Sequence, residues 1–258
     1  MLFRSVNRLW QHHLGRGLVS TPSDFGTRGE LPSHPELLDF FASELIRHNW
    51  ELKPIQRLIL SSRVYQQSCD TDEQRANIDR ENKFFWHRPR RRLEAEAIRD
   101  AVLAVSGQLD DRLYGPGTLS ETHRRRSLYF TVKRSQLVPS MTVFDAPDGT
   151  TPVAERPQTT IAPQALLLMN NPQVRDASRQ FAMELQPIAM KSLEDAIKLG
   201  YLTTVSRNPS PEELTNTADF LRQQAASYSA TDPSAGLSRS LIDFCQVLFC
   251  LNEFIYTE

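Results

Sequence analysis

LSRSLIDFCQVLFCL, residues 237–251, is apolar on almost every side when it is drawn as a helix. Apolar side chains recur in it at helical spacing, at Leu237, Leu241, Phe244, Cys245, Leu248 and Leu251. A helix with so little polar surface is stable only when other elements surround it. We therefore expect this segment at the centre of a mainly α-helical core.

The clearest amphipathic helix is predicted upstream, in RRRLEAEAIRDAVLAVSG (90–107). Its apolar side chains share one face, and Gly107 is placed to end it. On the opposite face the spacing predicts two ion pairs, Arg92 with Glu96 and Glu96 with Arg99. Such a helix buries one side against the core and keeps its charged side in water.

Two serines predict further helix starts. Ser33 stands three residues before Glu36, and Ser210 three residues before Glu213, which is the spacing of a capping box. Pro211 fits the first helical position, where its missing N–H costs no hydrogen bond. Both patterns predict helices that begin at these serines.

One segment departs from the helical pattern. In SLYFTVK (127–133) apolar and polar residues alternate, which is typical of a strand with one buried face. A lone strand is not stable, and MTVF (141–144) is the nearest segment that could pair with it. We therefore predict a small β element near residues 127–144. The next stretch, 145–158, is rich in Pro, Gly and Asp and predicts a long loop, and the polar stretch 69–83 predicts a solvated connection.

The length and composition favour one globular domain. The 258 residues can bury a core without disulfides or metals, and a hydrophobic content of 40% is ordinary for a soluble protein. We predict a single, mainly α domain over residues 1–258. Because the first residues already follow helical spacing, we expect an N-terminally truncated fragment of a larger multi-domain protein.

Composition and spacing disfavour several classes of protein. A net charge of −1 at pH 7 does not favour a nucleic-acid partner, and no apolar run is long enough for a membrane span. Five residues of helix separate the Cα atoms of Cys245 and Cys250 by about 7.5 Å along the axis, which is too far for a disulfide. Both are therefore predicted to be small buried hydrophobes. Since no metal-ligand or cofactor-binding motif is present, we expect no metal and no cofactor in this chain.

NRLWQHHLGRGLVSTPSDFG (7–26) concentrates residues that can do chemistry. Its adjacent histidines point about 100° apart on a helix, so they cannot bind one metal ion from the same face. One interpretation makes His13 a general base held by Asp24 across the turn, with Arg8 beside it. The other interpretation is commoner: Arg and His side chains near a helix end bind its last carbonyls and complement its dipole.

Asp145 and Asp148 flank a proline turn in FDAPDG (144–149). Two carboxylates in one loop could bind a hard cation such as calcium. The spacing is not that of an EF-hand, however, and Asp is common in turns. We therefore interpret both as turn residues rather than metal ligands.

Several long blocks of the chain resemble one family, in the family's order. They are VNRLWQHHLGRGLVSTPSDFGTRGELPSHPELLDFFA, RRRLEAEAIRDAVLAVSG, RSLYFTVKR, FDAPD, APQALLLMNNP and LNEFIYTE. Over essentially its whole length the chain resembles the planctomycete domain of unknown function numbered 1553. The resemblance implies the C-terminal part of a larger exported protein, with a companion domain of unknown function and often a cytochrome-c-like domain upstream. It brings no established catalytic residues.

The resemblance and the missing catalytic motifs together lead to a function hypothesis. We expect an extracytoplasmic, non-catalytic module that packs on the companion domain, in a haem-linked or polysaccharide-processing system. The alternative is a hydrolase or oxidoreductase site shared with the companion domain, which would use His13, Arg8 and Asp24.

We also predict that the stretch 7–26 and the FDAPD loop lie near each other, because functional residues tend to lie on loops held by a rigid scaffold. The candidate surface for a ligand or for the companion domain comprises Arg8, His13, Arg16, Asp24, Asp145 and Asp148. If the two stretches are close, exchange of Asp145 for Asn should weaken partner or ligand binding and leave the melting temperature nearly unchanged.

Overall fold

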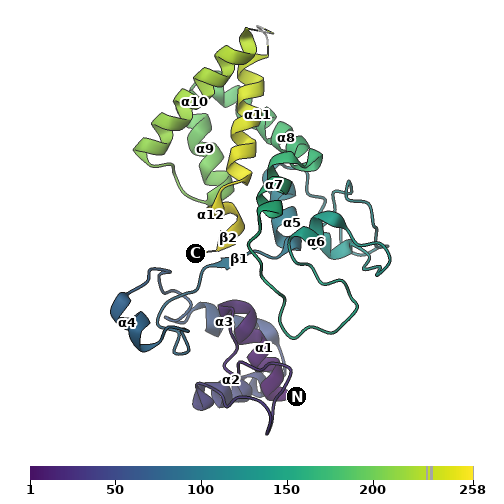
Figure 1. Ribbon diagram of the computed structural model, residues 1–258, viewed down its shortest axis with the longest axis vertical. Coiled ribbons are helices and arrows are strands. Elements are labelled where there is room, and N and C mark those ends of the chain that lie inside the picture. The colour runs from purple at the N-terminus through teal and green to yellow at the C-terminus, as the bar shows by residue number, and fades with distance from the viewer. Residues whose placement is uncertain (231, 233–234, 258) are drawn as a thin grey trace. The chain divides into compact units, whose positions relative to one another are not determined.

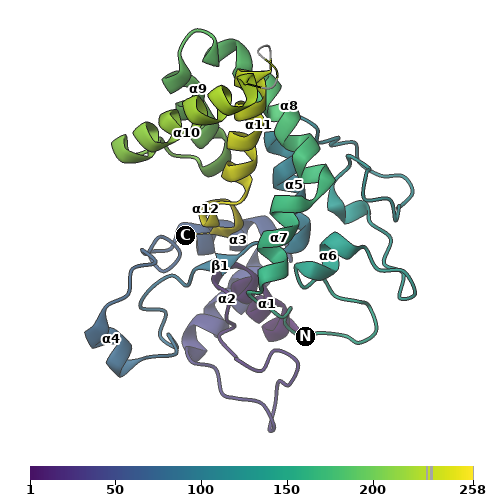
Figure 2. The same cartoon turned by 45° about the horizontal axis from the view of Figure 1, so that its top comes forward.

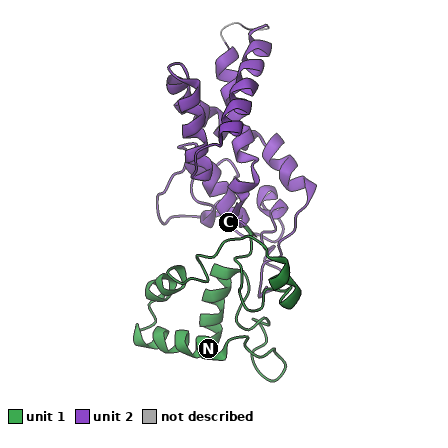
Figure 3. Ribbon diagram, turned by 90° about the vertical axis from the view of Figure 1, so that its left-hand side faces the viewer, with its two compact units in different colours: residues 1–91, 258 green, residues 92–257 purple. Residues whose placement is uncertain are grey.

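The computed structural model describes residues 1–230, 232 and 235–257, and helices dominate it in both views (Figure 1 and Figure 2). The mainly α fold with a small β element is confirmed. The chain divides into two compact units, Met1–Arg91 and Arg92–Thr257 (Figure 3). The single domain over residues 1–258 stays a prediction. Early proteolytic cleavage within 69–83 or 145–158 that releases two stable folded pieces would contradict it.

The first unit is built around an aromatic core. It contains α1 (Leu2–Leu14), α2 (Pro35–Arg47), α3 (Leu52–Leu60) and α4 (Glu73–Ile78). The Trp10 ring lies 5.7 Å from the Phe41 ring and 5.3 Å from the Phe85 ring. Trp10 is almost fully buried, so α1 contributes its apolar face to this core. Helix α4 interrupts the polar stretch 69–83, which is otherwise exposed over most of its length, as predicted.

Helix α2 begins later than its sequence pattern predicts. Pro35 occupies the first turn and His34 is the N-cap, without a side-chain cap bond. The Ser33 hydroxyl donates instead to the Leu18 carbonyl, at 3.2 Å. The capping box predicted at Ser33 is therefore wrong, because Pro35 sets the helical φ at the start and Ser33 binds a partner distant in sequence.

The second unit holds the remaining elements. They are β1 (Arg91–Arg92, which starts at the last residue of the first unit), α5 (Ala95–Val105), the 3-10 helix η1 (Ser127–Tyr129), α6 (Pro139–Val143), α7 (Ala162–Asn170), α8 (Pro172–Ala189), α9 (Leu193–Val205), α10 (Pro211–Ser229), α11 (Gly236–Phe249), α12 (Asn252–Ile255) and β2 (Tyr256–Thr257). Strands β1 and β2 pair, and next to them the Leu93 N–H donates to the Ile255 carbonyl at 2.7 Å.

Helix α11 is the central helix of the second unit, as its apolar sequence predicts. It lies between α8 and α10 in both views and packs on each of them (Figures 1 and 2). Leu241, Cys245 and Leu248 are completely buried. Both Cys245 and Cys250 are free thiols, and burial raises the pKa of each. The predicted role as a small buried hydrophobe is confirmed for Cys245, whereas Cys250 is half-buried at the edge of the core.

The β element is not where the sequence pattern predicts it. Residues Ser127–Tyr129 form a 3-10 helix, and MTVF lies in and just after α6, which Pro139 starts. The only β contacts of 127–133 in the described chain are isolated bridges, such as that of Phe130 with Thr118. Leu128 and Val132 are each 68% exposed, so the alternation does not produce a buried face.

Gly200 lies where α9 packs on α11. A Cβ atom at this position would stand 2.9 Å from Cε1 of Phe244 and 3.1 Å from Cδ1 of Leu248. Replacement of Gly200 by Val is expected to lower the free energy of unfolding by about 1–3 kcal/mol, because the overpacked core must shift. Urea unfolding measures this loss. The control is Thr203→Val on the exposed side of α9, with an expected change below about 0.5 kcal/mol; equal effects of both variants would contradict this account.

The capping box predicted at Ser210 is confirmed at the start of α10. Ser210 Oγ accepts the Glu213 N–H at 3.1 Å, and the Glu213 carboxylate accepts the Ser210 N–H at 2.7 Å. Arg207 donates to both oxygens of that carboxylate, at 2.7 and 2.8 Å, and also to Glu253 at 2.7 Å. The hydrogen bonds from Arg207 and Ser210 lower the pKa of Glu213 to about 2.

The stabilisation from Glu213 should therefore depend on pH. Its pKa in the folded protein lies below the ordinary value of 4.5, so its contribution is complete above that pH and is lost as the pH falls toward about 2. We expect the difference in melting temperature between wild type and Glu213→Gln to be largest near neutral pH and to shrink in acid. Thermal melts over this range measure it. Glu212→Gln, at the exposed neighbouring position, is the control for the loss of a carboxylate from the first turn of α10. A pH-independent difference at Glu213 would overturn the prediction.

Candidate functional site

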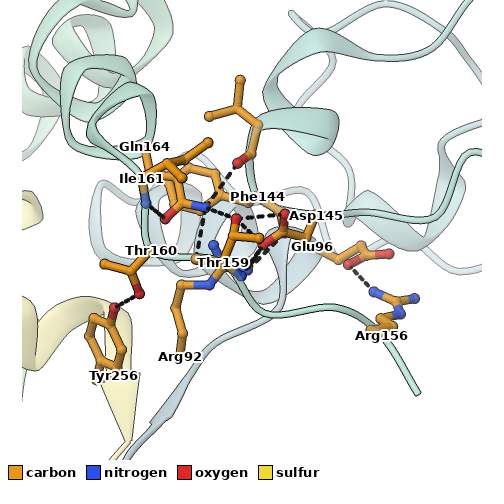
Figure 4. A network of polar contacts seen from close by, with 11 residues as sticks. Arg92, Glu96, Phe144, Asp145, Arg156, Thr159, Thr160, Ile161, Gln164 and Tyr256 are labelled. Carbon is orange, nitrogen blue, oxygen red and sulfur yellow. Dashed lines mark hydrogen bonds and ion pairs between the residues drawn. The ribbon is translucent and has the colours of Figure 1, made fainter.

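A network of polar side chains surrounds Asp145, at the end of α6 (Figure 4). Asp145 has a φ of 63°, in the left-handed region that residues other than glycine seldom adopt. Its N–H donates to the Thr142 carbonyl, and the Ala146 N–H donates to the Met141 carbonyl, so Asp145 ends the helix as glycine usually does. Strained backbone of this kind is often kept where a particular side chain is needed.

Within the described residues, Arg92 and Thr159 supply the hydrogen bonds to the Asp145 carboxylate. Arg92 Nη2 donates to Oδ2 at 2.7 Å and to the Phe144 carbonyl at 3.2 Å. Thr159 donates its backbone N–H at 2.8 Å and its hydroxyl at 2.9 Å. The ion pair is largely buried, because the side chains of Arg92 and Asp145 are 5% and 14% exposed. Burial alone would raise the pKa of Asp145, but the hydrogen bonds from Thr159 and the charge of Arg92 outweigh it and lower the pKa.

The contact between Asp145 and Thr159 closes the loop 145–159 at its base. Gln164, buried in α7, donates to the carbonyls of Val143 and Thr159, each at 3.1 Å. Figure 4 shows Gln164, Thr159 and Asp145 converging from both sides of the loop. Loops whose two ends are bound together in this way frequently carry function. The residues between are irregular, as the Pro- and Gly-rich sequence predicts.

The predicted ion pair between Arg92 and Glu96 is wrong. Arg92 lies in β1, before the first residue of α5, so it is not on the charged face of that helix. Glu96 pairs instead with Arg156 of the loop 145–159, at 2.8 Å. Arg99, also predicted to pair with Glu96, donates to backbone carbonyls of the segment 121–125. Glu96 and Arg99 thus each hold a loop instead of pairing with one another.

A groove of about 590 Å³ lies beside the loop 145–159, within the second unit. Its size falls within the range of ligand pockets, about 300–1,000 Å³. The first turns of α5, the segment 126–133, α6 and the loop border it. Apolar side chains in its lining are Ala97, Leu128, Phe130, Val132, Leu137, Val138, Met141, Ala146 and Pro147, and charged ones are Glu94, Glu96, Asp100, Arg126, Lys133 and Arg156.

The hydrogen-bond partners of Asp148 differ from those of Asp145. It is exposed, and its Oδ1 accepts the N–H of Thr150 at 2.8 Å and the hydroxyl at 2.7 Å. These hydrogen bonds lower the pKa of Asp148. Within residues 1–230, 232 and 235–257, no group of three or more His, Cys, Asp or Glu side chains is arranged to hold a metal ion.

The residues predicted for the first unit lie on α1 and on the loop after it. His13, in the last turn of α1, places Nδ1 at 2.6 Å from the Leu9 carbonyl of its own helix. Arg8 is exposed on α1 and Asp24 is exposed in the following loop. Among the described contacts, the side chains of these three residues form no hydrogen bond or ion pair with one another. A shared catalytic geometry would require His13 to turn away from its helix.

Arg16 makes the longest-range contact of the predicted residues in the first unit. It donates to the Glu81 carbonyl at 3.3 Å, and its guanidinium lies 3.7 Å from the Glu81 carboxylate. It also lines a cavity of about 240 Å³ together with Ser20, Glu30 and Lys83. Arg16 therefore ties the end of α1 to the segment after α4.

Sequence reasoning missed Asn7, the completely buried polar residue of the stretch 7–26. Its Nδ2 donates to the Val19 carbonyl at 3.0 Å, and its Oδ1 accepts the Val19 N–H at 2.8 Å. Gly17 leaves room for this contact, because a Cβ there would lie 2.6 Å from Nδ2 of Asn7. Asn7 lies one helical turn before Trp10, and this spacing predicts that Asn7 faces the core together with Trp10.

Sequence reasoning also missed the partners of Asp145. Gln164 carried a signal, because Gln at the third helical position often binds the backbone before the helix; its Oε1 lies 3.5 Å from the Ile161 nitrogen. The sequence around Arg92 and Thr159 gives no such indication. They are distant from Asp145 in sequence and reach it only through the folded chain.

A family model described as "PSD1: Protein of unknown function (DUF1553)" matches residues 4–221. No curated protein and no solved structure matches the chain. In the part of the chain that the structure describes, every helix is too short or too polar to cross a membrane.

Proposed function

Since the chain belongs to the PSD1 family of proteins of unknown function (DUF1553), we propose that it is a non-catalytic module that packs on a companion domain of the same longer protein. The network around Asp145 is the main support for a binding role. Arg92 and Thr159 already bind the carboxylate and lower its pKa, so Asp145 is poorly suited to accept a proton near neutral pH. Its role is to hold the loop 145–159 beside the groove.

The groove itself supports a binding role. Leu128 and Val132 line it and are each 68% exposed, and Leu137 adds further exposed apolar surface. Concave apolar surface of this kind is typical of sites that bind a partner. The companion domain is the partner that we propose for it.

The family resemblance is the support for the setting that we propose for this module. We place the longer protein outside the cytoplasm of a planctomycete, in a haem-linked or polysaccharide-processing system, with a cytochrome-c-like domain among its neighbours. The candidate surface of Arg8, His13, Arg16, Asp24, Asp145 and Asp148 remains part of the proposal. Spin labels at the exposed positions Asp24 and Asp148 test it, because a separation of roughly 30 Å or more would end the idea of one surface.

The central experiment is binding of the purified companion domain. A partner that binds only the folded module stabilises it by about 2.7 kcal/mol at a hundredfold excess over Kd. We therefore expect co-expression to raise solubility, and addition of the companion domain to raise the melting temperature. No change in either quantity would contradict the proposed function.

A further inference from the structure

On one side, the backbone of the segment 129–131 is hydrogen-bonded to the backbone of Thr118. The Thr118 N–H donates to the Tyr129 carbonyl at 3.0 Å, and the Thr131 N–H donates to the Thr118 carbonyl at 2.8 Å. Gly117 permits this approach, because a Cβ there would lie 2.6 Å from Oγ1 of Thr131 and 3.2 Å from the Tyr129 carbonyl oxygen. No further strand fits on this side.

The other side of the segment is open. Phe130 is extended, with φ −68° and ψ 134°, and successive residues of an extended chain direct their N–H and C=O groups to opposite sides. The Phe130 carbonyl therefore points away from Thr118. In the described ranges this carbonyl makes no backbone hydrogen bond, nor do the N–H and the carbonyl of Val132, and Val132 is 68% exposed. Such an edge is a template for pairing with another strand.

The groove lies along this open edge. Leu128, Phe130 and Val132, the apolar positions of the alternating pattern, all line it. The pattern predicts a strand with a covered face, yet within the described chain the side chains of Leu128 and Val132 remain uncovered. Lys133 also lines the groove, and its ammonium group forms no ion pair in the described part of the chain. Within the described residues, the open backbone edge therefore lacks a pairing strand, and the exposed side chains of Leu128 and Val132 lack a cover.

We propose that an extended segment of the companion domain binds in this groove as an added strand. Its backbone pairs with Phe130 and Val132, its alternate apolar side chains cover Leu128 and Val132, and an acidic residue pairs with Lys133. This inference rests on the proposed function and adds to it the place and the mode of contact. The loop 145–159, held by Asp145, forms one wall of the groove.

Hydrogen exchange of single amides, followed by NMR, tests the pairing directly. In the free protein the Val132 N–H has no backbone acceptor in the described chain and should exchange rapidly, whereas the Thr131 N–H is bound to Thr118. A saturating concentration of the companion domain should slow exchange at Val132 about tenfold or more. Thr131 is the internal control and should change much less.

A backbone substitution gives an independent test. Val132→Pro removes the N–H that the added strand needs and should weaken binding of the companion domain at least about tenfold. Val153→Pro is the matched control, because Val153 is 45% exposed in the loop 145–159 and does not line the groove. Circular dichroism verifies that both variants fold, and the exchange measurement does not depend on either.

The outcomes separate the two proposals. If the companion domain does not bind the wild-type chain, the proposed function fails. If it binds but leaves exchange at Val132 unchanged, or binds Val132→Pro with wild-type affinity, the added strand is overturned while the proposed function stands. If sedimentation shows self-association that Val132→Pro abolishes, a second copy of this chain occupies the groove instead, which also overturns the inference.

Discussion

Replacement of Asp145 by Asn is expected to lower the free energy of unfolding by about 3–5 kcal/mol. Arg92, with only 5% of its side chain exposed, would then be buried without its counter-charge. Urea unfolding measures the loss. Asp148→Asn is the control, because that carboxylate is exposed in the same loop and should change stability by less than about 0.5 kcal/mol.

This result would revise the expectation drawn from the sequence, in which Asp145→Asn leaves the melting temperature nearly unchanged. Such a small change is typical of an exposed loop residue, whereas the Asp145 side chain is 14% exposed and ion-paired. A lower pH should reduce the loss of stability caused by Asp145→Asn. The pKa of Asp145 is lowered from its ordinary 3.8, so its stabilisation is present above that pH and is lost as the pH falls further.

A double-mutant cycle separates the ion pair from other effects. Arg92→Met and Asp145→Asn each leave one charged or polar group without its partner, but the double variant leaves no uncompensated charge. The double variant should therefore lose at least about 1 kcal/mol less than the sum of the two single losses. Additive losses would show that Arg92 and Asp145 are not coupled, and the network would need another explanation.

The helices of this chain are largely predictable because their signals are local. The central position of α11 follows from its apolar sides, since such a helix must be surrounded. The two predicted capping boxes show that local spacing is not always sufficient to locate the start of a helix. Ser210 and Ser33 have the same spacing to a Glu, but Pro35 moves the start of α2 and Ser33 binds Leu18 instead.

The candidate site is less predictable because its contacts join distant segments. Asp145 could be named from its turn, yet its partners Arg92 and Thr159 carry no local signal and meet it only in the folded unit. The segment 127–133 shows the converse. Its alternation predicts a strand, but in the described chain only isolated bridges form there, so the local pattern alone does not determine the structure of this segment.

The stretch 7–26 contains residues that stabilise the fold and residues of the candidate surface, and Asn7 is one of the former. Asn7→Ala is expected to lower the free energy of unfolding by roughly 2–4 kcal/mol, because the N–H and the carbonyl of Val19 would each lose a buried partner. Arg8→Ala, at the exposed neighbouring position on α1, should change stability by less than about 0.5 kcal/mol. Thermal and urea unfolding of the two variants measure the contrast.

The same pair of variants distinguishes fold from function in this stretch. If Arg8 belongs to the candidate surface, Arg8→Ala should weaken binding of the companion domain although its stability is unchanged. Asn7→Ala should affect binding only to the extent that it unfolds the first unit, so well below its melting temperature it should bind like the wild type. A loss below about 1 kcal/mol for Asn7→Ala would mean that the Val19 backbone finds other partners, such as water. In that case the buried Asn would need a reason other than holding the chain after α1.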